Sequence, residues 1–468
     1  MKKRKESRKV ARHPINGETL RAAVAWAINA NVFTHLKFHG NTSWQVLDLI
    51  LLTVVWVWSG NTSLTGAFVE ARSWSRGILG RCAVETFQGL MKALAANTAK
   101  LLPVVATQLQ GLMEKQGGRH WRVGRWLALA VDGSRVSVPR TQQNETSFCA
   151  PNFGKSRTAK YRQKKRRARG IRRRSKKKAQ PVKPQIWLTL LWHMGLHMPW
   201  SWKSGPSNCS ERDHFRSLLD EQKFPKNTLF CADAGFTGYE LWKAMIDAGH
   251  AFLIRVGANV KLLRELGYIK EYDGIVYCWT NEAARTGHPP LVLRLLQLQV
   301  GKRKMWMVTT VLDPKKLSDA EAVNLYRLRW GIELQFRTVK QTFGRQKLRC
   351  RTPDRALVEL DWALVGLWMI QLFAVKEQIE IGEVPEHCSV SLAIAVIRSM
   401  MNKCLERPSE SFRQRLRGAQ KDKYKRRRTK QARYRPDSKD KPAAGKPKIR
   451  AATRKHKARL KWYLNTAA

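Results

Sequence analysis

Apolar residues recur three or four positions apart over residues 18 to about 105, which is the spacing of an amphipathic helix. Two Gly-containing turns, at residues 39–41 and 59–61, interrupt the pattern. The run 46–58 is almost wholly apolar, but it is shorter than the roughly 20 residues that cross a bilayer. We interpret that run as a buried core helix and predict a helical N-terminal domain over residues 18–110.

From Trp126 the pattern changes to that of buried strands. The apolar run 126–131 ends at Asp132, which is followed by glycine, and a second run covers residues 186–194. A short strand at 228–232 leads into Asp233, with a glycine two positions later. An acid at the end of a strand, beside a glycine, is a common placement for an active-site residue.

Strand-like runs continue in the next part of the chain and predict a β-rich insertion over residues 234–317. The runs are 251–256, 275–280, 291–300 and 305–312. The segment 318–321 then has the form of a capping box and predicts the start of a helix. A further apolar helix is expected from about 357 to 375, with a plausible start at Pro353.

The helix predicted after residue 318 carries four polar residues at a regular spacing. They are Tyr326, Arg329, Glu333 and Lys340. At about 100° per residue, all four fall within roughly 60° around the axis of a continuous helix. The pattern therefore predicts one narrow face on which a carboxylate, two cations and a phenol can hold a metal and bind phosphates.

Three acids from distant segments share a chemistry: Asp132 and Asp233 follow strands, and Glu333 lies on a later helix. Two-metal phosphoryl transfer needs such hard oxygen ligands around the scissile phosphate. An order of strand, strand and helix is that of an RNase H-like core. We therefore predict an α/β fold whose RNase H-like mixed-sheet core has two parts, residues 120–233 and 318–405.

The charge balance indicates a polyanionic partner. The 468 residues include 88 Lys and Arg against 35 Asp and Glu, a formal net charge of +53. We expect a basic disordered start over 1–17, a basic loop at 155–178 within the core, and a basic disordered tail over 406–468. Such segments would bind a polyanion strongly, with high salt sensitivity and without regard to sequence, unless they are only solvated charge.

Other classes of protein fit the sequence less well. The eight cysteines form no Cys-x-x-Cys pair, and no secretory signal is evident, so we expect a reducing cytosol and no structural zinc. His193 and His197 lie four apart in a strand context, which favours core or turn histidines over a metal site. We also expect no membrane span.

The four-residue signature, with the two upstream acids, resembles that of a known family. Its spacing, Tyr326-x2-Arg329-x3-Glu333-x6-Lys340, is similar to the Tyr-Arg-Glu-Lys motif that marks the insertion-sequence-four group of DDE transposases. The resemblance covers roughly residues 125 to 375. It includes a β-rich insertion between the second Asp and the Glu, which is a feature of this group.

The resemblance implies roles for each residue. Asp132, Asp233 and Glu333 would be catalytic and would bind two Mg²⁺ ions, with Mn²⁺ as a substitute. Tyr326, Arg329 and Lys340 would hold double-stranded transposon-end DNA, and the helical N-terminal domain over residues 18–110 would bind the transposon ends.

The family cuts at terminal inverted repeats and joins the freed 3′-hydroxyls to target DNA, in several members through a hairpin intermediate. A flipped base then stacks on an aromatic side chain of the insertion, for which Trp279 and Trp306 are candidates. A homodimer in the DNA synaptic complex, in a bacterial cytosol and associated with the nucleoid, would follow.

Simpler explanations remain open for each residue. An Asp after a strand is more often a turn former, Arg329 and Lys340 could lie on a solvated helix face, and Tyr326 could pack at the edge of the core. An RNase H-like nuclease without strand transfer is the alternative enzyme. A catalytically inactive, domesticated DNA-binding protein is the alternative from another class.

Overall fold

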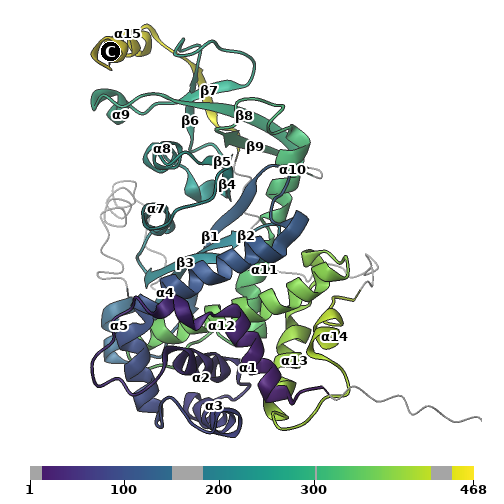
Figure 1. Cartoon of the computed structure of the whole chain (residues 1–468). Coiled ribbons are helices and arrows are strands. Elements are labelled where there is room, and N and C mark those ends of the chain that lie inside the picture. Colours follow the sequence, from purple (N-terminus) through teal and green to yellow (C-terminus); the bar gives the residue numbers. More distant parts are fainter. Residues whose placement is uncertain (1–12, 150–182, 301–302, 423–444, 468) are drawn as a thin grey trace, which may run out of the picture. The chain divides into compact units, whose positions relative to one another are not determined.

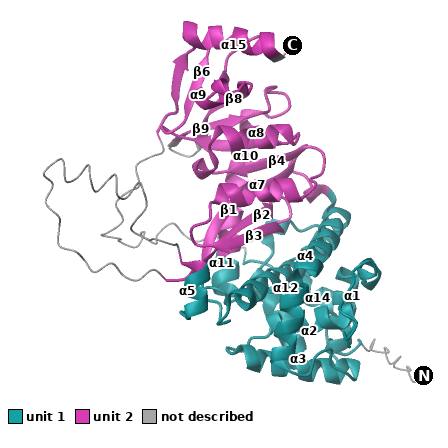
Figure 2. Ribbon diagram, turned by 90° about the vertical axis from the view of Figure 1, so that its left-hand side faces the viewer, with its two compact units in different colours: residues 1–118, 137–147, 337–422 teal, residues 119–136, 148–336, 423–468 magenta. Residues whose placement is uncertain are grey.

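The computed structural model describes residues 13–149, 183–300, 303–422 and 445–467. The chain divides into two compact units (Figure 2). The helical unit comprises residues 1–118, 137–147 and 337–422, and the sheet unit comprises residues 119–136, 148–336 and 423–468. The predicted basic loop at 155–178, and the first twelve residues of the predicted basic start, lie outside the described residues.

The helical unit is built around one long apolar helix, α12 (Pro353–Glu380). Thr352 is its N-cap and Pro353 opens its first turn, where the missing N–H of proline costs nothing. By length and composition alone α12 could cross a membrane, but 94% of its most apolar window is buried inside the protein. It is therefore the core helix of this unit, and α2, α4 and α13 pack against it.

The described part of this unit contains eight α-helices. They are α1 (Asn16–Ala27), α2 (Val46–Trp58), α3 (Leu64–Leu79), α4 (Phe87–Gly117), α5 (Gln142–Phe148), α12, α13 (Val390–Asn402) and α14 (Phe412–Arg417).

Tryptophan side chains join α12 to the N-terminal helices. The Trp58 indole donates a hydrogen bond to the Gly366 carbonyl at 2.8 Å, and the Trp362 indole donates to the Thr98 hydroxyl at 2.9 Å. Ten consecutive residues of α2, Leu49 to Trp58, are buried, which confirms the predicted core helix. The N-terminal helices thus share one core with residues 337–422, while the DNA-binding role predicted for residues 18–110 stays a prediction.

The sheet unit contains a ten-stranded mixed sheet (Figure 1) in the order β10-β6-β7-β8-β9-β5-β4-β1-β2-β3. The strands are β1 (Leu127–Ser137), β2 (Gln185–His193), β3 (Met198–Pro206), β4 (Thr228–Ala232), β5 (Ala251–Val256), β6 (Lys261–Arg264), β7 (Ile275–Cys278), β8 (Leu291–Val300), β9 (Arg303–Thr309) and β10 (Lys448–Ala451). The helices are α7 (Glu211–Glu221), α8 (Tyr239–Asp247), α9 (Asn281–Arg285), α10 (Asp319–Leu328), α11 (Gly331–Arg337) and α15 (Arg454–Ala467).

The pairing of these strands confirms the expected α/β class with a mixed sheet. Strands β1 and β5 both run parallel to β4, whereas β3 is antiparallel to β2. Strands β7, β8 and β9 form an antiparallel series that joins the same sheet where β9 pairs with β5. The strands predicted between residues 250 and 312 thus extend the core sheet.

Strand β1 is longer than the sequence indicated. It runs from Leu127 to Ser137, so Asp132 lies inside the strand and the prediction that the strand ends there is wrong. The parallel pairing with β4 nevertheless stops at the pair Ala130 and Cys231. Asp132 therefore lies just beyond the part of β1 that pairs with β4.

The single continuous helix predicted for the four-residue signature is also wrong. The helix begins as predicted, with Ser318 and Glu321 forming a capping box, but α10 ends at Leu328. At the break the Trp330 N–H donates to the Arg327 carbonyl, three residues back, at 3.2 Å. After α11 the chain forms a π-helical segment, Thr338–Thr342, so a regular 100° per residue does not apply.

The break coincides with a close tertiary contact at Gly331. A Cβ atom at this position would lie 1.9 Å from Cη2 of Trp192, a buried residue of β2. Only glycine lets the backbone of α11 approach the indole so closely. The contact comes from a distant strand, which explains why periodicity in the local sequence did not reveal it.

The prediction of a disordered tail is wrong for three described segments: α14, β10 and α15. Strand β10 pairs in parallel with β6 and closes that edge of the sheet, while residues 423–444 lie outside the described residues. The few apolar side chains of the tail account for its order, because Leu416 and Leu460 are both buried.

Candidate active site

Asp132 and Asp233 follow the paired parts of two neighbouring strands. Each lies two residues beyond the last parallel pair, Ala130 with Cys231. Asp132 Oδ1 accepts a hydrogen bond from the Gly133 N–H at 2.8 Å, and Asp233 Oδ1 accepts one from the Gly235 N–H at 2.7 Å. The register of the sheet thus brings the two carboxylates to the same edge, and adjacent backbone amides orient them.

Glu333 lies on α11 near Arg329, and Arg329 in turn lies against the ring of Tyr326. Arg329 Nη2 is 3.4 Å from Glu333 Oε1, and the Arg329 guanidinium lies 5.2 Å from the centre of the Tyr326 ring. Tyr326 and Arg329 are only 8% and 7% exposed, whereas the Glu333 side chain is 37% exposed. The structure thus brings these three signature residues together, with Arg329 buried between the phenol and the carboxylate.

The electrostatics of Asp132 show that all three predicted acids act on one another. Burial raises the pKa of Asp132 to about 6, and the negative charges of Asp233 and Glu333 add to this effect. The Gly133 N–H and the Arg329 guanidinium oppose it. Asp132 therefore senses the charge of both other predicted acids, with Arg329 as the nearby cation.

A fourth carboxylate lies beside these acids: Glu211, at the start of α7, which the sequence did not indicate as a site residue. Its side chain lies against both glycines of the site: a Cβ atom on Gly133 would be 2.6 Å from Glu211 Cγ, and one on Gly235 would be 3.9 Å from Oε2. Burial raises the pKa of Glu211 to about 7, and Asp132 and Asp233 contribute. We name Asp132, Glu211, Asp233 and Glu333 the acid cluster.

In the sequence, Glu211 has an ordinary explanation, since acids are favoured in the first turn of a helix. The glycines that follow Asp132 and Asp233 were the available signal, because they leave the space that Glu211 fills. Arg135 and Arg212 lower the pKa of Glu211 and offset part of the negative charge.

Lys340 is placed in the π-helical segment, in the helical unit. The side chain is half-buried, and burial lowers its pKa. Its contact with DNA, like that of Tyr326 and Arg329, stays a prediction.

The two candidate stacking residues differ in exposure. Trp279 is 8% exposed and its indole donates to the His288 carbonyl at 2.9 Å, as expected of a core residue. Trp306 lies on β9, with the Lys446 amine 5.1 Å from its ring centre. Of the two, only Trp306 already has a cation over its ring and stays outside the buried core.

His193 has the surroundings of a core histidine. It is fully buried and stacks on Trp121 at 4.9 Å between ring centres. Burial lowers its pKa to about 3. A buried, stacked ring of this kind is that of a core histidine, as the sequence favoured for His193.

The acid cluster offers the donors that a divalent cation prefers, namely carboxylate oxygens. Two of its members, Asp132 and Glu211, have raised pKa values, so a cation placed among them would relieve repulsion that the protein otherwise bears. Across the described ranges, no three His, Cys, Asp or Glu side chains converge closely enough to ligate one ion. The donor set fits Mg²⁺ or Mn²⁺ in kind, and binding would require the side chains to draw together.

Known proteins resemble this chain over the region that holds the site. Residues 127–369 match the family model described as a transposase DDE domain. Over 230 residues the chain is 27% identical to transposase InsG for insertion sequence element IS4 of Escherichia coli (strain K12), a match that covers 47% of this chain and 51% of InsG. The chain thus spans about half the length of this curated relative.

One solved structure also aligns with most of the chain. It is the cryo-EM structure of a piggyBac transposase synaptic complex with hairpin DNA, with 13% identity, a TM-score of 0.39, and coverage of 86% of this chain and 81% of that chain. The acid cluster and the four signature residues all lie between residues 127 and 369, inside the matched family region.

Proposed function

The chain belongs to the transposase DDE domain family, and we propose that it carries out cut-and-paste DNA transposition. It would bind terminal inverted repeats, cut the DNA at their boundaries and join the freed 3′-hydroxyls to target DNA. The observation that supports this best is that Asp233 and Glu333, acids from two other segments, both act on the Asp132 carboxyl, beside Arg329, which pairs with Glu333.

In this proposal Asp132, Asp233 and Glu333 hold two Mg²⁺ ions, or Mn²⁺ in their place. Bound divalent ions would activate a water or 3′-hydroxyl nucleophile and stabilise the leaving oxygen. Arg329 orients the Glu333 carboxylate and balances charge in the buried part of the site. Glu211 acts as a positioning residue, because it fills the space beside Gly133 and Gly235 that the carboxylates border.

The proposed partner is double-stranded DNA, both as transposon ends and as target. The net charge of +53 favours a polyanion, and we assign DNA contacts to Tyr326, Arg329 and Lys340. Cutting two ends in one complex calls for two active sites, so we propose a homodimer when DNA is bound. A chromosomal substrate also implies action in the bacterial cytosol, at the nucleoid.

The test is cleavage of a supercoiled plasmid that carries the inverted repeats flanking the gene. Purified full-length protein is incubated with Mg²⁺ or with EDTA, and cut positions and joined products are mapped by sequencing. Asp233→Asn removes one proposed ligand. Asp220→Asn, an exposed acid on α7, is the matched control.

We expect cuts at the repeat boundaries and joined products only with Mg²⁺, with loss in Asp233→Asn and retention in Asp220→Asn. Cuts without any joined product would replace the proposal with an RNase H-like nuclease. Specific binding with no cut in any condition would replace it with an inactive DNA-binding protein.

A further inference from the structure

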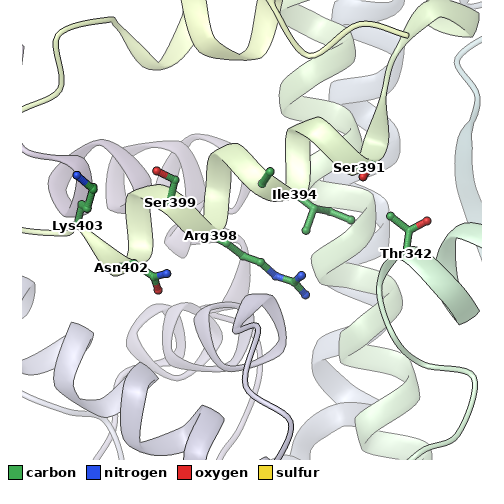
Figure 3. Close-up of a pocket in the computed structure, with 8 residues that line it drawn as sticks. Thr342, Ser391, Ile394, Arg398, Ser399, Asn402 and Lys403 are labelled. Carbon is green, nitrogen blue, oxygen red and sulfur yellow. The ribbon is translucent and has the colours of Figure 1, made fainter. Parts of the chain in front are cut away.

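A groove runs along α13 in the helical unit, with a volume of about 540 Å³, and both apolar and polar side chains line it (Figure 3). Its polar lining residues are Thr342, Ser391, Arg398, Ser399, Asn402 and Lys403. Four of them lie on α13, and Lys403 directly follows it. With the apolar lining residues Ile394 and Ala395 they recur every three or four positions, so they share one face of that helix. No acidic residue lines the groove.

Arg398 is the central feature of the groove, because none of the described residues supplies a counter-ion for its charge. The side chain is partly buried, and burial lowers its pKa. Its Nε donates to the Trp58 carbonyl at 3.0 Å. Within the part of the chain that the structure describes, its terminal nitrogens make no hydrogen bond and no carboxylate pairs with it.

The surroundings of Arg398 add further positive charge. Arg345 donates to the Val57 carbonyl at 3.3 Å and Arg349 donates to the Asn61 carbonyl at 3.1 Å, so three guanidiniums gather at the end of α2. Arg398 lowers the pKa of Arg345, which shows that the two cations repel each other. The buried Glu359 opposes this effect at Arg345 and accepts the backbone N–H of Arg349.

Capping the carboxyl end of α2 explains part of this arrangement, since cations are favoured there. That role uses the Nε atom of Arg398. It leaves the two terminal nitrogens available to a ligand in the groove that Arg398 lines. A desolvated guanidinium beside another cation is costly unless an anion joins it. The groove thus has the charge, the donors and the open space for an anionic ligand.

We propose that the α13 groove binds the phosphodiester backbone of DNA, with Arg398 as the main phosphate contact. This inference rests on the proposed function, which supplies DNA as the partner. It adds a binding surface outside the four-residue signature, in which hydroxyl and amide groups of Thr342, Ser399 and Asn402 would donate to further phosphate oxygens.

The shape of the groove favours a DNA strand over a free nucleotide. From Ser391 to Lys403 the helix face is ~18 Å long, comparable to about five nucleotides of one strand at ~3.4 Å each. No aromatic side chain lines it to stack on a base. Thr342 is the last residue of the π-helical segment that also carries Lys340, so the groove continues a segment already predicted to contact DNA.

The test is the salt dependence of binding to a fluorescent duplex, measured by anisotropy with full-length protein. Arg398→Gln should weaken binding about fivefold to tenfold near 0.1 M salt and reduce the slope of log K against log salt by about 0.9. Arg398→Lys keeps the charge, so its slope should match the wild type. Lys92→Gln, an exposed lysine on α4, is the matched control and should change neither quantity.

Two results would overturn the inference. One is an unchanged slope in Arg398→Gln. The other is an equal loss of slope in Arg398→Lys with a lowered melting temperature, which would reduce Arg398 to a structural cap of α2. Inorganic phosphate is titrated in parallel: saturable, Arg398-dependent binding of phosphate with no effect on the DNA slope would reassign the groove to a free anion.

The same variants separate this inference from the proposed function. Arg398→Gln should need about fivefold to tenfold more protein to reach the same cleavage with Mg²⁺, whereas Asp233→Asn should not cut at any protein concentration but should keep the wild-type slope. A wild-type protein that never cuts, yet loses slope in Arg398→Gln, would refute transposition and support the groove.

Discussion

The acid cluster of the sheet unit and the α13 groove of the helical unit both hold partly buried like charges, negative in the cluster and positive in the groove. In the acid cluster, buried carboxylates repel one another, and the pKa values of Asp132 and Glu211 are raised. In the groove, a partly buried guanidinium lies near a second one, and the pKa values of Arg398 and Arg345 are lowered. Each site bears an uncompensated charge that a ligand of opposite sign would neutralise.

The sign of the buried charge decides which ligand each site would bind. Carboxylates held by glycine amides at a sheet edge fit a hard cation. The Arg398 guanidinium donates one hydrogen bond to a backbone carbonyl, and its two terminal nitrogens have no partner among the described residues. Such a group fits a phosphate. The variants below should break one site while leaving the other intact.

The largest effect is expected at Glu333. Glu333→Gln keeps the side-chain volume but removes a proposed metal ligand and its negative charge. Loss of several kcal/mol of transition-state stabilisation would lower the cleavage rate about 10³-fold or more. The rate is measured with DNA at saturation, alongside Glu282→Gln, an exposed glutamate on α9. Equal rates for the two variants would remove Glu333 from the chemistry.

The next effect concerns the break between α10 and α11. Gly331→Ala places a Cβ atom where the Trp192 ring lies, so we expect about 1–3 kcal/mol lower stability and slower cleavage. Urea unfolding measures the first and the plasmid assay the second. Gly111→Ala, within α4 with open space around it, should instead gain up to about 1 kcal/mol. A neutral Gly331→Ala would mean that α11 does not need this close contact.

Glu211 should make stability depend on pH when metal is absent. Its folded-state pKa of about 7 lies above its ordinary 4.5, and that of Asp132, about 6, lies above 3.8. The folded state therefore binds more protons between about pH 4 and 7, and the free energy of unfolding falls as pH rises through that range.

Glu211→Gln should remove part of this fall. In EDTA, the free energy of unfolding should fall by about 1 kcal/mol less in the variant than in the wild type between pH 5 and pH 8. This figure is discounted for the partial exposure of the side chain. Urea unfolding at the two pH values gives the difference, with Glu240→Gln on α8 as control. A pH dependence identical to that of the wild type would show that Glu211 is not destabilised by its neighbours.

The smallest effect is expected at Lys340. Lys340→Ala should weaken duplex binding by less than tenfold and reduce the salt slope by about one phosphate contact. Anisotropy titrations compare it with Lys115→Ala, an exposed lysine on α4. A slope equal to that of the control would argue against a phosphate contact and would leave the α13 groove as the better-supported DNA surface of this unit.

Local patterns were enough to predict several elements. The capping box at Ser318 and the Pro353 start of α12 are set by residues within one turn, so sequence alone identified them. The apolar run of α2 needed only its composition. The order of Asp132, Asp233 and Glu333 along the chain indicated the site, because it depends on chain order and not on exact geometry.

The features that sequence did not predict depend on distant contacts. The helix breaks where Gly331 meets Trp192, and Glu211 joins the site because it fits beside Gly133. Strand β10 forms because it pairs with β6 at the edge of the sheet, although two of its four residues are basic. In each case the deciding partner lies far away in the sequence, where periodicity and composition carry no signal.

The most direct test of the acid cluster as a transposition site isolates the joining step. A short duplex that ends at the inverted-repeat boundary with a free 3′-hydroxyl is mixed with a target plasmid, the protein and Mg²⁺, and joined products are counted by sequencing. We expect joining that disappears with a 3′-dideoxy end, with EDTA and in Glu333→Gln, but persists in Glu282→Gln. Joining that survives in Glu333→Gln or without metal would contradict the assignment.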